Sequence, residues 1–281
     1  MTGTLYLCAT PIGNLEDVTR RVGRILAEAD LICAEDTRQS AKLLDYLGIG
    51  RRRLIGYHQH NEATRTPRVI EELLAGKTVA VISDAGTPGI SDPGEALVRA
   101  AIDQGIPVVP VPGPSAVVAA LCASGLPTTR FTFCGFLPRH GKDRRALLQE
   151  LAHRPDTLIF YEAPHRLVES LRDLLTELGD RRAVIAREIS KVYEEFRRGT
   201  ISQLMESLVE GAPLGEIVLL VAGAPPGSGQ ERAEMGFDPT ELMEALLEQG
   251  LGRRVAALIV ARFSGMGRNE AYQLGLDKGK D

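Results

Sequence analysis

The sequence lacks the features that would place it in a membrane, secreted or metal-binding class. It has no run of about 18 apolar residues, the length of a membrane-spanning helix. Residues 1–6 show neither the basic stretch nor the apolar segment of a secretory signal. The four cysteines form no C-x-x-C pair, which argues against a metal site or a disulfide framework. These absences predict a cytoplasmic protein without a membrane segment, in which the cysteines are reduced and buried.

Two nucleotide-binding motifs are also absent. No G-x-G-x-x-G follows the first expected strand, and no G-x-x-x-x-G-K-[ST] occurs anywhere. The five histidines do not form a zinc-protease motif. His58 and His60 alternate near Glu62, which leaves a shared metal only as an alternative. We therefore predict no dinucleotide fingerprint, no P-loop and no metal.

The chain has little net charge. Its formal charge is −4, whereas nucleic-acid binders usually carry a basic domain. The arginines are nevertheless clustered, at 51–53, 181–182, 197–198 and 253–254. Basic patches on an acidic chain can still bind phosphate backbones, so the charge leaves nucleic-acid binding open.

The first half alternates short apolar runs with segments of helical periodicity. Strands are expected at residues 5–9, 31–34, 54–57, 78–82 and 108–111, and helices at 18–29, 38–47, 66–75, 95–104 and 114–123. Apolar strands separated by helices predict an α/β domain with a mainly parallel sheet that is covered on both faces.

The pattern changes near residue 127. Strands are expected at 131–136, 156–161, 183–186, 193–198 and 216–222, and helices at 144–152, 164–178 and 201–210. Residues 188–199 leave no room for a helix, so they predict a hairpin and a mixed sheet. We predict two α/β domains, at 1–115 and 116–223, a linker at 224–236, and a helical appendage at 237–281. Asp238 and Pro239 suit the start of its first helix.

Four unusual turns leave strands of the first domain. They span residues 10–17, 34–38, 83–94 and 112–116, and they are rich in glycine, proline and acidic residues. Ligands of open α/β sheets gather outside the carboxyl ends of the strands, and glycines let a backbone approach a ligand closely. The turns predict an enzyme with a glycine-rich cleft, but they do not identify its cofactor.

Eight motifs in order resemble one family. They are LYLCATPIGNLED (5–17), AEDTR (34–38), YHQHNE (57–62), SDAGTPGISDPG (83–94), PGPSA (112–116), FYEAPHR (160–166), REISK (187–191) and GEIV (215–218). The chain resembles the ribosomal RNA small subunit methyltransferase I proteins, a branch of the tetrapyrrole-methylase superfamily that methylates a cytidine 2′-oxygen. The helical tail resembles the family's C-terminal extension more distantly.

The resemblance implies the tetrapyrrole-methylase fold, in which S-adenosylmethionine lies in a cleft between two α/β domains of a usually dimeric protein. By motif position, the cofactor-binding residues would be Pro11, Ser83, Asp84, Ala85, Gly86, Thr87, Gly89, Ile90, Gly113, Ser115, Ala116, Tyr161, Glu162, Ala186 and Gly215. Ser83 and Ala85 depart from the superfamily's G-D-P loop, which fits the RNA branch.

The resemblance also suggests where chemistry occurs. A ribose hydroxyl is a weak nucleophile, so a positioned base should help. The catalytic candidates are Glu188, Lys191, Glu35 and Asp36, with Glu188 preferred because it would face the cofactor loops. The substrate-binding candidates are Asn14, Arg38, Tyr57, His58, Arg166 and Arg187, since arginines suit phosphate and aromatic rings can stack on an unstacked base. The expected partner is ribosomal RNA, within the small ribosomal subunit.

Two other functions remain open at this point. A methyltransferase acting on a porphyrin- or corrin-like small molecule would also need arginines, to bind propionates. A non-enzymatic RNA-binding assembly factor would carry a degenerate cofactor cleft. Residues 34–38 and the helical tail speak against the first function, and intact Asp84, Gly86, Gly89 and Gly113 speak against the second.

Overall fold

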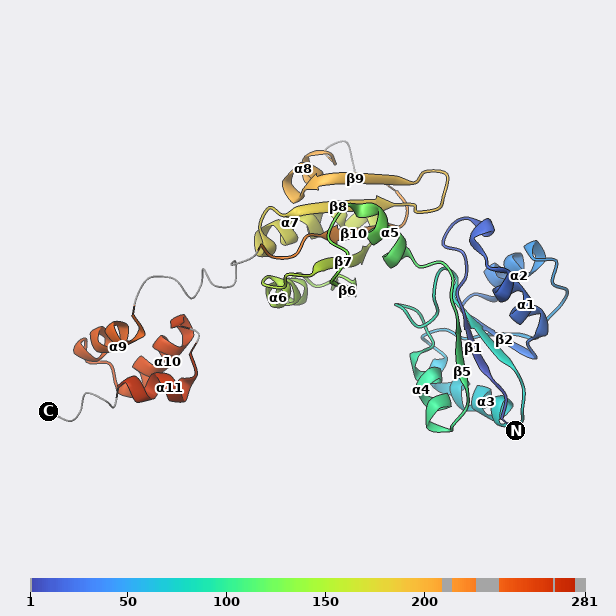
Figure 1. Cartoon of the computed structure of the whole chain (residues 1–281), viewed down its shortest axis with the longest axis horizontal. Helices are drawn as coiled ribbons and strands as arrows, with labels where there is room; N and C mark the ends of the chain where they lie inside the picture. The colour runs from blue at the N-terminus through green and yellow to red at the C-terminus, as the bar shows by residue number, and fades with distance from the viewer. Residues whose placement is uncertain (1, 209–213, 226–237, 265, 276–281) are drawn as a thin grey trace. The chain divides into compact units, whose positions relative to one another are not determined.

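The computed structural model describes residues 2–208, 214–225, 238–264 and 266–275. The chain forms two compact units (Figure 1), one of residues 1–148 and 156–222, the other of residues 149–155 and 223–281. Both α/β sheets belong to the first unit. The boundary predicted between two α/β domains at residues 115 and 116 therefore stays a prediction.

The first sheet is entirely parallel. Its strands are β1 (Leu5–Cys8), β2 (Leu31–Ala34), β3 (Leu54–Gly56), β4 (Val79–Ile82) and β5 (Val108–Val111). They lie in the order β3-β2-β4-β1-β5, and each neighbouring pair is parallel. The predicted parallel sheet is confirmed. All five strands therefore end at the same edge.

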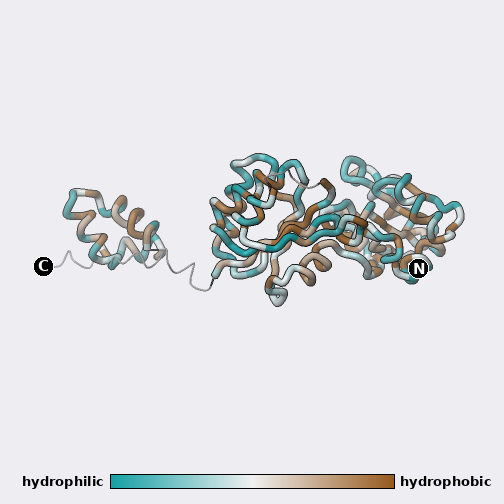
Figure 2. The backbone as a smooth tube through the Cα atoms, turned by 90° about the horizontal axis from the view of Figure 1, so that it is seen from above, coloured by the Kyte–Doolittle hydropathy of each residue, from teal (hydrophilic) through white to brown (hydrophobic). Residues whose placement is uncertain are grey.

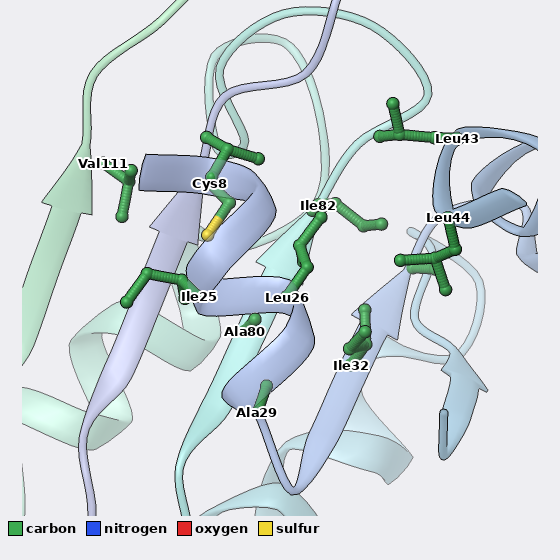
Figure 3. Close-up of a cluster of buried hydrophobic side chains, with 12 residues drawn as sticks. Cys8, Ile25, Leu26, Ala29, Ile32, Leu43, Leu44, Ala80, Ile82 and Val111 are labelled. Carbon is green, nitrogen blue, oxygen red and sulfur yellow. The ribbon is translucent and has the colours of Figure 1, made fainter. Parts of the chain in front are cut away.

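Helices cover both faces of this sheet, as continuous burial of its central strands requires. On one face lie α1 (Arg20–Glu28), which follows the 3-10 turn η1 (Leu15–Asp17), and α2 (Thr37–Tyr46). Figure 3 shows Ile25 and Leu26 of α1 packed over Cys8 and Ala80. On the other face, α3 (Glu62–Leu74) and α4 (Glu95–Asp103) pack against the sheet.

The start of α3 differs from the prediction. The apolar periodicity predicts a helix from about residue 66, whereas the helix begins at Glu62 and contains Pro67. The Asn61 side chain accepts a bond from the His58 backbone N–H at 2.9 Å, and the Thr66 hydroxyl donates to the Glu62 carbonyl at 2.8 Å. These local bonds stabilise the earlier turn.

The second sheet is mixed. Its strands are β6 (Phe131–Phe136), β7 (Thr157–Glu162), β8 (Arg182–Arg187), β9 (Glu195–Thr200) and β10 (Ile217–Val221), in the order β6-β7-β10-β8-β9. β6 and β7 are parallel, whereas the other neighbouring pairs are antiparallel. The predicted mixed sheet and the predicted hairpin of β8 and β9 are confirmed.

Helices flank the second sheet as well. α5 (Ala116–Ser124) packs Val117 and Leu121 onto strands β7, β8 and β10. The other elements are α6 (Gly141–Leu151), the 3-10 turn η2 (Pro164–Arg166), α7 (Leu167–Leu178) and α8 (Ile201–Glu206). The central strands β7, β8 and β10 are almost entirely buried, and Figure 2 shows hydrophobic and hydrophilic stretches alternating along the chain. The core of this sheet therefore fixes the strand ends from which the site is built.

The second unit contains α9 (Pro239–Glu248), α10 (Arg253–Ser264) and α11 (Arg268–Leu274). They share a core that includes Met243, Val260 and Ala271. Asp238 caps α9 by accepting a bond from the Thr240 N–H at 2.8 Å, as expected. Most of the predicted linker at 224–236 lies outside the described residues.

The cysteines follow the prediction only partly. Cys8 and Cys33 are buried, whereas Cys134 is partly exposed and Cys122 is exposed; all four are free of disulfides. The burial predicted for Cys122 is wrong, because this residue lies on the outer side of α5. None of the helices in the described part of the chain has the length and apolar character needed to span a bilayer.

Candidate active site

Hydrogen bonds join the unusual turns after β1, β4 and β5 at the carboxyl edge of the first sheet. Thr10 and Gly86 exchange backbone hydrogen bonds of 2.8 and 3.0 Å. The Thr10 hydroxyl donates to the Ser83 carbonyl at 3.0 Å, and the Thr87 hydroxyl donates to the Pro114 carbonyl at 3.2 Å. The turns after β1, β4 and β5 therefore form one connected surface, as parallel strands ending at the same edge predict.

A cavity of about 360 Å³ lies against this surface. Its size falls within the range of about 300–1,000 Å³ that is usual for small-molecule sites. One wall comes from the first-sheet turns and the other from the ends of β6, β7 and β10 with the turn after β8. The lining residues are Ile12, Ala85, Gly86, Thr87, Ile90, Ser91, Asp92, Ser115, Ala116, Phe136, Tyr161, Glu162, Ala163, Pro164, Ile189, Gly215, Glu216, Ile217 and Val218.

The cavity brings together many of the predicted cofactor-binding residues. Those that line it are Ala85, Gly86, Thr87, Ile90, Ser115, Ala116, Tyr161, Glu162 and Gly215. Pro11, Ser83, Asp84, Gly89, Gly113 and Ala186 do not line it. Ser83 is buried beneath the turn, and its hydroxyl bonds to carbonyls within the turn. Gly113 packs against Ala9, so closely that an added Cβ would lie 3.0 Å from the Ala9 methyl group.

Some lining residues were not predicted. Ser91 and Asp92 belong to the turn at 83–94, whose composition drew attention to the loop without singling them out. Phe136 ends β6, and its ring centroid lies 5.5 Å from that of Tyr161 in an edge-to-face contact. No feature of the sequence indicated Phe136 as a site residue, because a phenylalanine in a strand is usually part of the hydrophobic core. Its side chain is instead 57% exposed at the cavity.

Glu188 and Lys191, two predicted catalytic residues, are bound to each other. The Lys191 ammonium donates to the Glu188 carboxylate at 2.8 Å, and the backbone N–H of Glu216 donates to the same oxygen at 2.9 Å. The hydrogen bond from Lys191 is the main reason that the pKa of Glu188 lies below its usual value. Neither side chain lines the cavity. In this geometry Glu188 supports the cavity wall at Gly215 and Glu216.

Glu35 and Asp36 are also engaged. The backbone N–H of Asp84 donates to Glu35 at 3.3 Å, and the backbone N–H of Asp36 donates to Asp84 at 3.0 Å. Asp36 caps α2 and pairs with Arg38 at 2.8 Å. The hydrogen bonds from Arg38 lower the pKa of Asp36 to about 2. Neither carboxylate lines the cavity, and together they join the turns after β2 and β4.

Comparison with known proteins assigns the chain to a family. The profile of the family described as Tetrapyrrole (Corrin/Porphyrin) Methylases matches residues 4–205. The chain belongs to this family. The chain is also 48% identical, over 97% of its length and 94% of the relative's, to ribosomal RNA small subunit methyltransferase I of Halalkalibacterium halodurans. The resemblance drawn from the motifs is confirmed, and the methylase is a member of that branch.

Solved structures agree on the fold. The crystal structure of the methyltransferase CobJ has a TM-score of 0.60 at 22% identity and covers 80% of this chain and 95% of its own. A uroporphyrin-III C-methyltransferase from Thermus thermophilus, complexed with S-adenosylhomocysteine, has a TM-score of 0.54 at 21% identity and covers 78% and 97%. The predicted tetrapyrrole-methylase fold is confirmed.

The predicted substrate-binding residues of this methylase lie in different surroundings. Tyr57 is 1% exposed, and its hydroxyl lies 2.8 Å from that of Thr66. A ring so deeply buried cannot stack on a nucleobase, so Tyr57 is not among the proposed RNA contacts. His58 is half-buried, and its Nε2 lies 3.0 Å from the Asn61 amide. Asn14 is exposed and caps η1.

The three arginines predicted to contact the substrate also differ in burial and in their partners. Arg166 is largely buried and donates to the carbonyls of Leu137 and Pro138 at 2.6 and 2.9 Å. Arg187 donates to the Leu214 carbonyl at 2.5 Å. Arg38 differs, because its side chain is 88% exposed and its ion pair is with the neighbouring Asp36. Arg38 is the most accessible of these arginines to a phosphate.

Glu62 has a structural task rather than a metal-binding one. Its carboxylate accepts bonds from the Tyr57 hydroxyl at 3.2 Å and from the Gly94 N–H at 3.1 Å. It thereby anchors the far end of the cavity-lining turn at 83–94. Within the described residues no group of histidine, cysteine and acidic side chains has the arrangement of a metal site.

Proposed function

We propose that this methylase transfers a methyl group from S-adenosylmethionine to the 2′-hydroxyl of a cytidine ribose in bacterial 16S ribosomal RNA. The observation that carries the proposal is the 48% identity, across nearly the whole chain, with a ribosomal RNA small subunit methyltransferase. Sequence identity to the methyltransferase CobJ and to the uroporphyrin-III C-methyltransferase is lower, at 22% and 21%. This difference favours RNA over a porphyrin-like substrate.

The cavity suits the proposed cofactor. Small side chains at Ala85, Gly86, Ser115, Ala116 and Gly215 leave backbone groups accessible to a ligand. Ile90 and Val218 add apolar surface, as ligand sites usually require. These residues would hold S-adenosylmethionine, which supplies an electrophilic methyl group on a positively charged sulfur.

The chain's main contribution to such a reaction is positioning. Displacement at a methyl carbon requires the attacking oxygen to lie about 3–3.5 Å away and in line with the leaving group, and correct placement is worth several kcal/mol. The hydrogen bonds from Thr10 and Thr87 hold the cavity-lining turns in fixed register. Rigid turns of this kind support one geometry of hydroxyl and methyl group.

The biological setting is part of the proposal. We propose the small ribosomal subunit as the setting in which the RNA is methylated, and the cytoplasm as the location. The exposed Arg38 offers a contact for a phosphate near the cleft. The motif resemblance supports a homodimer.

Methyl transfer to undermethylated small ribosomal subunits tests the proposed function. The subunits are incubated with the enzyme and a labelled donor, and the RNA is then hydrolysed with alkali. A 2′-O-methyl group blocks cleavage of its linkage, so one new resistant dinucleotide that begins with methylated cytidine is expected. Uroporphyrinogen serves as the competing acceptor. Label on uroporphyrinogen, or label in RNA without a resistant linkage, would contradict the proposal.

A further inference from the structure

Three carboxylates line the cavity, and two of them are neutralised. Glu162 is 2% exposed and accepts bonds from the Ser170 hydroxyl at 2.5 Å and the Ala163 N–H at 2.8 Å, with Arg166 at 3.5 Å. Glu216 extends toward solvent and pairs with Lys191 at 3.2 Å. Each of these two carboxylates therefore has a cationic side chain beside it, Arg166 and Lys191 respectively.

Asp92, the third carboxylate, has different surroundings. No lysine or arginine of the described segments forms an ion pair with it. It is half-buried, and the groups that face it are the carboxylates of Glu35 and Asp84 and the side chain of Ser83. Burial is the largest cause that raises the pKa of Asp92, to about 6, and repulsion from the Glu35 carboxylate is the next. The hydrogen bond with Ser83 lowers this pKa, and the charge of Asp84 raises it. Among the described residues, Asp92 is thus the cavity-lining carboxylate that has no paired lysine or arginine.

The backbone around Asp92 is held in an unusual conformation. Ser91 has φ = 62°, which is rare for a residue with a side chain. Gly94 has φ = 139°, and its N–H bonds to Glu62. Such conformations persist only where the surroundings enforce them, and they are common at functional sites. Here they fix Asp92 on the cavity wall.

Asp92 also faces the second sheet. Burial raises the pKa of Tyr161, on β7, to about 12, and the negative charge of Asp92 is the next largest cause. Both residues line the cavity. The carboxylate thus lines the same cavity that is proposed to hold S-adenosylmethionine, between the glycine-bearing turns and the β7 wall.

We propose that Asp92 is the general base that accepts the proton of the attacking hydroxyl; this inference rests on the proposed function. As the hydroxyl oxygen forms its bond to the methyl carbon, the carbon–sulfur bond breaks and its electron pair stays on sulfur. The hydroxyl proton passes to an Asp92 carboxylate oxygen. The products are a methyl ether and a neutral thioether, and the protonated Asp92 then returns its proton to solvent.

Asp92→Asn, which keeps the size of the side chain and removes the base, tests the inference. The turnover number on small ribosomal subunits is expected to fall by roughly 10²–10⁴-fold. Calorimetric affinity for S-adenosylhomocysteine should stay near that of the wild type, because an asparagine side chain preserves the shape of the wall. Asp103→Asn, at the exposed end of α4, is the matched control and should turn over normally. Near-normal turnover of Asp92→Asn would overturn the inference.

The pH dependence of the wild-type enzyme gives a second measurement that does not need the variant to fold. A base must be ionised to act, so kcat/KM should fall about tenfold per pH unit below pH 6 and level off above it. A profile that is flat between pH 5 and 7 would contradict the role of Asp92. Absence of ribose methylation by the wild type would instead contradict the proposed function, so the two failures are distinguishable.

Discussion

At the scale of single residues, Gly215 shows how closely the cavity wall is fitted. Its φ is 106°, and a Cβ built on it would lie 2.5 Å from the carboxyl carbon of Glu188. The same Glu188 oxygen that accepts the Lys191 ammonium also accepts the next backbone N–H, that of Glu216. A side chain at residue 215 would therefore displace Glu188 and the wall that it supports.

Gly215→Ala should lower stability and cofactor affinity together. Backbone strain alone costs about 1–3 kcal/mol, and the clash with Glu188 adds to it. Gly105→Ala is the matched control, because Gly105 also has a positive φ, 67°, but nothing within 4 Å of an added Cβ. Urea denaturation and calorimetry with S-adenosylhomocysteine measure both effects. Equal loss of stability in the two variants, with unchanged affinity, would contradict this account.

At the scale of elements, the start of α2 links helix capping to the site. Asp36 accepts the Arg38 backbone N–H at 2.8 Å, and its own N–H donates to Asp84 on the cavity-lining turn. An acidic cap also interacts favourably with the positive end of a helix. Asp36 and Arg38 of the sequence AEDTR thus help to position a helix and a neighbouring loop. These structural roles explain both charged residues without a role in catalysis.

Acid should remove the contribution of the Asp36 cap to the stability of the folded protein. The folded-state pKa of Asp36, about 2, lies below its usual value of 3.8. The stabilisation is therefore present above about pH 4 and is lost as the pH falls toward 2. The melting temperature of Asp36→Ala should lie below that of the wild type at pH 7, and the difference should shrink between pH 4 and pH 2. A difference that stays constant with pH would contradict this assignment.

At the scale of the whole molecule, every cavity-lining residue belongs to the first compact unit. Helices α9–α11 have their own core and contribute none of these residues. The exposed side chains of α10 include Val255, Leu258 and Phe263. The cofactor site and the helical unit are therefore expected to be separable.

A chain that ends after residue 225 should keep its cofactor site. Its dissociation constant for S-adenosylhomocysteine is expected to stay within about threefold of the full-length value, a difference below about 1 kcal/mol. Calorimetry on both chains measures this, and circular dichroism checks that the shortened chain is folded. Loss of binding by a folded shortened chain would show that the second unit takes part in forming the site.

Much of the fold was predictable because it depends on local patterns. The period of the apolar residues separated strands from helices, and residues 188–199, which leave no room for a helix, predicted a hairpin. The parallel arrangement also implied that the turns after β1, β4 and β5 would meet, as they do through Thr10, Gly86 and Pro114. These features follow from neighbours in the chain and from the geometry of parallel sheets.

The sequence by itself determined the alternation of strands and helices, the glycine-bearing turns and the motifs that mark the family. Only the tertiary structure decided which carboxylates are neutralised. The Glu188 carboxylate accepts a hydrogen bond from the backbone N–H of Glu216, 28 residues away. Asp92 instead faces Glu35 and Asp84, and it pairs with no cation of the described segments. The Lys191 partner of Glu188 lies in the same motif, but the burial of Asp92 and the approach of Glu35 come only from folding, so a motif alone does not give a carboxylate's basicity.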